Sequence, residues 1–139
     1  MTTTGGRPDD TPAETAARRV AKGVLADLSI TGWEVGSVTV GTGRADRGAE
    51  QEPNVLVGLR PVAARRPLLL AFLPLDVPVA HACAVLAGHI LDGGLREGLT
   101  VGLRCPTGAH VLVATVSGDR AVWSCPCAPD GERPVTGCP

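Results

Sequence analysis

The longest apolar stretch of the chain is "PLLLAFLPLDVPVAHACAVLAGHIL", at residues 67–91. Its length approaches that of a segment that spans a membrane. Pro74, Asp76 and Pro78 interrupt it, however, and divide it into two shorter pieces. The stretch therefore predicts a strand followed by a helix. A membrane-associated accessory protein, with this stretch as a single span, is kept as the third alternative for function.

The strand predicted at 67–75 is apolar at almost every position, which is typical of a central strand covered on both faces. The helix that follows should begin near Asp76 and run to about Asp92, because Gly93 and Gly94 then end it. Its core face is expected to hold Val79, Cys83, Leu86 and Ile90.

Local signals predict the other elements. The capping-box sequence "TPAE" at 11–14 begins a helix that apolar spacing extends over about 12–30. The apolar phase of the strand at 33–40 shifts near its middle, which predicts a β-bulge around Gly36. Further strands are predicted at 54–60, 99–105, 110–116 and 120–125.

The resulting order of elements is α-β-β-β-α-β-β-β. It predicts an α+β domain with a largely antiparallel sheet and with the helices packed on one face. The 139-residue chain is expected to have a disordered N-terminal tail (1–10), a single domain (11–127) and a flexible C-terminal tail (128–139). The order is similar to that of secretion-chaperone and YbjN-like folds, and less closely to that of roadblock domains, which lack one early strand. Topology of this kind does not assign a function.

Composition narrows the classes of partner. The net charge of −1 gives no broad basic surface, so we expect neither nucleic acid nor an anionic membrane as a partner. The N-terminus has no signal-peptide pattern, which favours a cytoplasmic location with reduced thiols. Arginine greatly outnumbers lysine, as in bacterial proteins from GC-rich genomes.

The sequence contains no recognisable catalytic constellation. No serine lies in a G-x-S-x-G elbow. His81 and His89 stand eight residues apart on the second predicted helix, about 12 Å along its axis, which is too far to share one metal ion. We therefore expect no enzyme activity and no cofactor, with zinc as the alternative discussed next.

Several cysteines gather at one end of the predicted C-terminal strands. Cys105 and Cys125 each end a predicted strand, and these two strands run in the same direction. One strand lies between them, so the two cysteines are separated by two strand spacings, or roughly 9.5 Å. That spacing is too long for a disulfide between the two cysteines, and it is awkward for two ligands of one zinc ion. The sequence also lacks the C-x-x-C pair that is typical of structural zinc sites. Zinc binding, a redox role and bystander thiols all remain open. The candidate metal ligands are Cys105, His110, Cys125, Cys127 and Cys138.

Three arginines surround the loop "RPVAARRP". Arg60, Arg65 and Arg66 could bind carboxylates of an acidic protein partner in a bidentate way, or could form a solvated loop. A sheet with helices on one face also leaves the other face for a partner. We therefore expect a small non-catalytic protein-binding, adaptor or regulatory domain, which could form a homodimer. An exposed apolar sheet face would support this interpretation.

Overall fold

The computed structural model describes residues 10–44, 51–99, 101–105, 111–125 and 131–139. The predicted disordered tail therefore lies outside the described residues, except for Asp10. The elements are α1 (Pro12–Asp27), β1 (Trp33–Arg44), β2 (Gln51–Pro61), β3 (Leu69–Pro74), α2 (Val79–Arg96), β4 (Val113–Ser117), β5 (Arg120–Ser124) and β6 (Arg133–Pro134). Their order, α-β-β-β-α-β-β-β, confirms the predicted α+β class.

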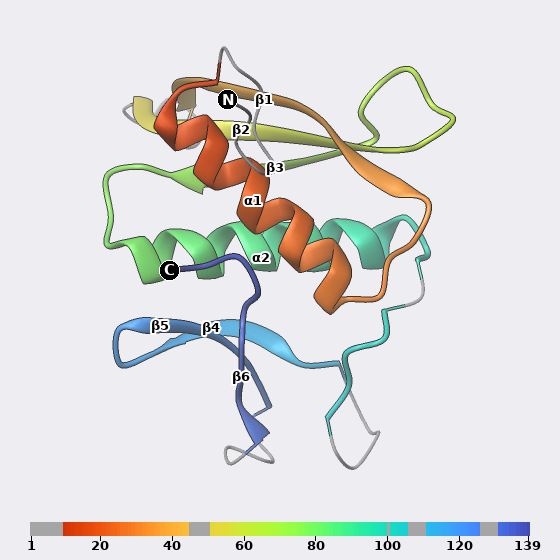
Figure 1. The fold of residues 1–139 in the computed structure, drawn as a ribbon, viewed down its shortest axis with the longest axis vertical. Coiled ribbons are helices and arrows are strands. Elements are labelled where there is room, and N and C mark those ends of the chain that lie inside the picture. The colour runs from red at the N-terminus through yellow and green to blue at the C-terminus, as the bar shows by residue number, and fades with distance from the viewer. Residues whose placement is uncertain (1–9, 45–50, 100, 106–110, 126–130) are drawn as a thin grey trace, which may run out of the picture.

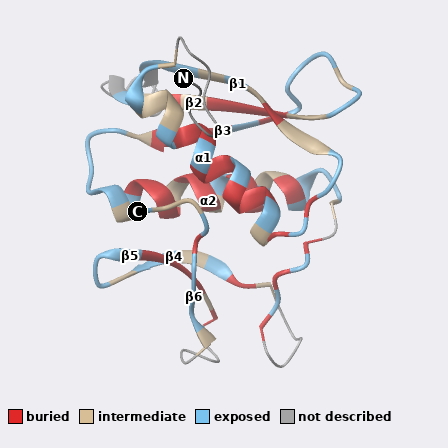
Figure 2. Cartoon of the chain, viewed as in Figure 1, coloured by how far each residue is buried: buried red, intermediate tan, exposed pale blue. Residues whose placement is uncertain are grey.

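The strands form two antiparallel sheets, in the orders β1-β2-β3 and β4-β5-β6. Figure 1 shows the two helices between them, so that the fold has three layers. Helix α2 contacts β3 on one side and both β4 and β5 on the other. Its buried residues are too many for a single stripe, and this explains why it packs between two sheets (Figure 2). The sequence predicts one larger sheet with helices on one face. The structure instead has two smaller sheets, each with helices on one face.

The capping box at the start of α1 is present and also fixes the helix to the first sheet. The Thr11 hydroxyl accepts from the Glu14 amide at 3.2 Å, and the Glu14 carboxylate accepts from the Thr11 amide at 2.8 Å. The second carboxylate oxygen accepts from the Val40 amide of β1 at 3.1 Å. These hydrogen bonds hold the pKa of Glu14 below its usual value, and the bond from the Thr11 amide has the largest effect.

The β1–β3 sheet buries one face against the helices. A register shift between Val35 and Ser37 confirms the predicted bulge at Gly36, and the bulge keeps apolar side chains of β1 on the inner face. The prediction that residues 67–75 form a central strand is wrong. Strand β3 lies at the edge of its sheet, and only its inner side chains are covered. The buried inner residues of β2 and β3 are Val55, Val57, Leu59, Leu69, Ala71 and Leu73.

The β4–β6 sheet differs from the three C-terminal strands predicted. Among the described residues of the segment 99–105, the structure has only an isolated bridge, between Arg104 and Val111. The third strand is instead β6, which pairs with β5 through Val122 and Pro134. It lies within the segment that the sequence predicts to be a flexible tail. Burial of Val135, which is 2% exposed, explains how so short a strand is held.

Residues 131–139 pack along α1. The Asp27 carboxylate accepts from the Trp123 indole N–H at 2.9 Å, from the Thr136 amide at 2.8 Å and from the Thr136 hydroxyl. The backbone of this segment passes so close to α1 that a Cβ on Gly23 would lie 2.1 Å from the Thr136 carbonyl oxygen. Gly137 has a φ of +90°, which favours glycine at this turn.

Candidate functional site

The outer face of the β1–β3 sheet carries an uncovered apolar patch. Leu70 is 57% exposed, Leu68 is 54% exposed and Phe72 is 36% exposed. Phe72 pairs with the half-buried Leu56 of β2, so that these side chains lie on the same face. Both helices lie on the opposite face (Figure 1). We call Leu56, Leu68, Leu70 and Phe72 the apolar patch.

The free edge of β3 is partly occupied by α2. The Phe72 amide donates to Nδ1 of His89 at 3.1 Å, and the two rings meet edge to face with centroids 5.9 Å apart. Leu70 and Phe72 also line a hollow of about 140 Å³ beside α2, together with Asp92 and Arg96. Because the Phe72 amide is already bound, addition of a further strand at this edge is disfavoured. The exposed face is therefore the more accessible surface for contacts.

The predicted contact arginines lie at one end of the apolar patch. Arg60 pairs with Glu34 at 2.8 Å and donates to the Arg65 carbonyl at 3.4 Å, so its guanidinium is already bound within the chain. Arg65 and Arg66 are exposed in the connection between β2 and β3. A contact role for these arginines stays a prediction. The sequence does not predict the apolar patch beside their loop, because a strand that is apolar on both faces indicates a covered strand.

Two of the cysteines predicted as metal ligands lie near β4. Cys105 and Cys125 are buried, with exposures of 3% and 1%. Arg104 bridges to Val111 and Ser124 pairs with Val113, so the two thiols belong to segments on either side of β4.

Of the other three predicted metal ligands, the structure describes only Cys138. Cys138 forms a hydrogen bond with Cys83 of α2, and His110 and Cys127 lie outside the described residues. In the part of the chain that the structure describes, no three His, Cys, Asp or Glu side chains gather as a metal site.

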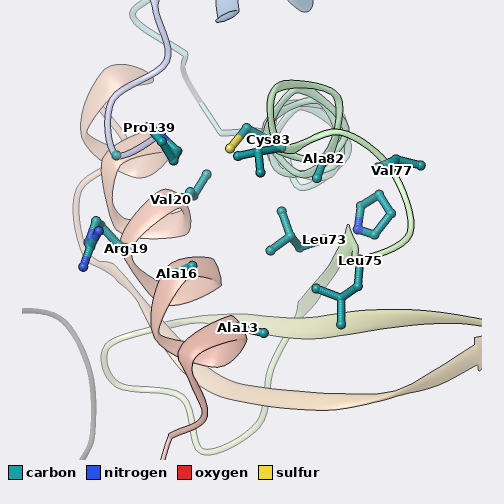
Figure 3. Close-up of a pocket in the computed structure, with 13 residues that line it drawn as sticks. Ala13, Ala16, Arg19, Val20, Leu73, Leu75, Val77, Ala82, Cys83 and Pro139 are labelled. Atoms are coloured by element: carbon teal, nitrogen blue, oxygen red, sulfur yellow. The ribbon is translucent and has the colours of Figure 1, made fainter. Parts of the chain in front are cut away.

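A cavity of about 180 Å³ lies between α1, α2, the end of β3 and residues 137–139 (Figure 3). Its walls are mostly apolar, although Arg19 also lines it. Val20 lies on one side and Leu73 on the other, and Cys83 lies on its α2 side. The sequence does not predict this cavity, because its lining comes from four segments that only the tertiary fold brings together.

The chain matches no known family model, no curated protein and no solved structure. Among the described residues, no helix has both the length and the apolar character needed to cross a membrane. A cytoplasmic location stays a prediction.

Proposed function

We propose that this chain is a small, non-catalytic protein-binding domain whose contact surface is the apolar patch. The observation that carries the proposal is the exposure of Leu70 and Phe72 on the sheet face opposite the helices, where α2 reaches the Phe72 ring through His89 but leaves Leu70 57% exposed. Burying one such side chain in an interface is favourable by roughly 1.5–3 kcal/mol. Neighbouring apolar residues on one face therefore supply a contact that scattered surface residues do not.

The charges beside the patch indicate the chemistry of the partner. Arg65 and Arg66 are exposed at the end of the patch where Glu34 is already bound to Arg60. A partner segment with apolar side chains followed by a carboxylate would match both features, because the guanidinium group binds carboxylates in a bidentate way. A second copy of this chain is the other occupant that the test below distinguishes.

The substitution Leu70→Glu tests the surface with little risk to the fold, because Leu70 is mostly exposed. We expect it to weaken partner binding by about tenfold or more, because it places a charge in the apolar patch and repels an acidic partner. The measurement is recovery of partner proteins on immobilised wild-type and variant chains, followed by titration of the purified partner. Sedimentation of the pure chain shows whether the partner is a second copy.

The matched control is Val113→Glu, because Val113 is 48% exposed on a strand of the other sheet. This variant should bind as the wild type does. The proposal is contradicted if the wild-type chain neither binds a partner nor self-associates, or if Leu70→Glu binds as tightly as Val113→Glu. Reversing the charge of Arg65 and Arg66 together should weaken binding to an acidic partner in the same assay.

Zinc binding is the second candidate function. The observation in its favour is the burial of Cys105 and Cys125 on either side of β4, where a structural zinc site would be shielded from water. In this proposal zinc would contribute directly to the stability of the β4–β6 sheet.

Native mass spectrometry of protein purified under reducing conditions tests zinc binding. We expect one zinc per chain, which a chelator removes together with part of the sheet signal in circular dichroism. The Cys105→Ser variant should lose the metal, while Cys83→Ala should keep it. A metal-free, folded wild-type chain would rule zinc out.

A further inference from the structure

Two thiols from distant parts of the chain meet beside the cavity. Cys83 lies on α2 and is 2% exposed, while Cys138 is half-buried against the core. A hydrogen bond joins their side chains. Gly137 and Pro139, on either side of Cys138, line the same cavity as Cys83. The contact therefore joins α2 to the segment 131–139.

The two thiols differ in their acidity. The hydrogen bond from Cys138 lowers the pKa of the Cys83 thiol, and the same bond raises the pKa of the Cys138 thiol. Cys83 also lines the cavity, whereas Cys138 does not, so Cys83 is the thiol that a small oxidant in the cavity would meet. Cys138 lies next to it and is the thiol that would attack an oxidised Cys83.

The cavity gives small molecules a place next to Cys83. Its volume of about 180 Å³ is several times the roughly 30 Å³ that one water molecule occupies in the liquid. A hydrogen peroxide molecule, slightly larger than water, fits such a space. Although Cys83 is buried from bulk solvent, it lines this cavity and has a second thiol beside it, and a neighbouring resolving thiol is typical of redox-sensitive cysteines.

We propose that Cys83 and Cys138 form a reversible, peroxide-sensitive thiol pair whose disulfide fastens residues 131–139 to α2. The proposal goes beyond protein binding and does not depend on it, because neither thiol belongs to the apolar patch. The segment is already held to α1 by Asp27. The disulfide would add a covalent link to the second helix.

The chemistry balances with hydrogen peroxide as the oxidant. The Cys83 thiolate attacks one peroxide oxygen, the O–O bond breaks, and the departing hydroxide takes a proton to become water. The Cys83 sulfur is thereby oxidised to a sulfenic acid. The Cys138 sulfur then attacks the Cys83 sulfur, and the sulfenic oxygen leaves as a second water with the Cys138 proton. A dithiol reductant reverses the linkage by thiol–disulfide exchange.

Peptide mapping of the full chain tests the proposal. A glutamate-specific protease cuts after Glu97 and Glu132, which leaves Cys83, Cys138 and the other three cysteines in three different peptides. The reduced, folded protein is treated with hydrogen peroxide, its remaining thiols are alkylated, and the digest is analysed by mass spectrometry. We expect the Cys83 peptide to be recovered mostly linked to the Cys138 peptide, and to be released by dithiothreitol.

The Cys138→Ser variant separates the two steps. Without its partner, Cys83 should gain one oxygen, about 16 Da, instead of forming a disulfide. Protein treated in urea is the control for random pairing. The proposal is overturned if the folded protein forms no Cys83–Cys138 link, or forms the same mixture as the unfolded protein. The wild-type peptide map decides the question even if the variant does not fold.

Discussion

Replacing Asp27 with alanine should lower the free energy of unfolding by about 3 kcal/mol, because three donors lose one shared carboxylate. Those donors are the Trp123 indole N–H and both the amide and the hydroxyl of Thr136. Trp123 is only 1% exposed, so its N–H would be left without an acceptor in the core. Such an orphaned donor costs more than the hydrogen bond itself contributes.

Urea unfolding followed by circular dichroism measures the effect, and Asp92→Ala is the matched control. Asp92 is an exposed carboxylate on α2, so its removal should change stability by no more than about 0.5 kcal/mol. Asp27→Asn should fall between the two, because an amide oxygen still accepts but carries no charge. Equal stability of Asp27→Ala and Asp92→Ala would show that the segment 131–139 is not held through this carboxylate.

The second large effect is expected from Gly23→Ala. This substitution should destabilise the domain, although alanine usually stabilises a helix relative to glycine. Alanine in a helix interior is normally more stable than glycine by about 1 kcal/mol. At Gly23, however, the new Cβ would lie 2.1 Å from the carbonyl oxygen and 2.6 Å from the carbonyl carbon of Thr136. Because both are backbone atoms, residues 131–139 must shift away from α1. We expect a loss of about 1–3 kcal/mol.

The matched control for this substitution is Gly88→Ala. Gly88 lies inside α2, and nothing stands within 4 Å of a Cβ built there. The control should therefore gain up to about 1 kcal/mol in the same urea titration. If both alanine variants were stabilised alike, the close packing of residues 131–139 on α1 would be contradicted.

The features that the sequence predicts well are local ones. The capping box at Thr11 and Glu14 depends on residues three apart, and the bulge at Gly36 depends on the phase of neighbouring side chains. Both are therefore visible in a short window of sequence. The same holds for both helices and for strands β1 to β5, because each has its own periodicity, whereas the last strand of the order, β6, is not predicted.

The features that the sequence does not predict depend on contacts between distant residues. An apolar outer face on β3 is typical of a covered strand, and only the tertiary fold shows that Leu70 is mostly exposed and Phe72 partly so. Strand β6 has too few residues for a periodic pattern and is fixed by its pairing with β5. The contact of Cys83 with Cys138 likewise arises from how residues 131–139 cross the helices.

The hydrogen bonds of Asp27 also order the steps by which the domain forms. They join residues separated by 96 and 109 positions, so the chain must close very long loops before these bonds exist. During synthesis, α1 and the β1–β3 sheet leave the ribosome well before residue 136. We expect the β4–β6 layer to close last, so that until then the newly made chain exposes the side of its helices that this layer will cover.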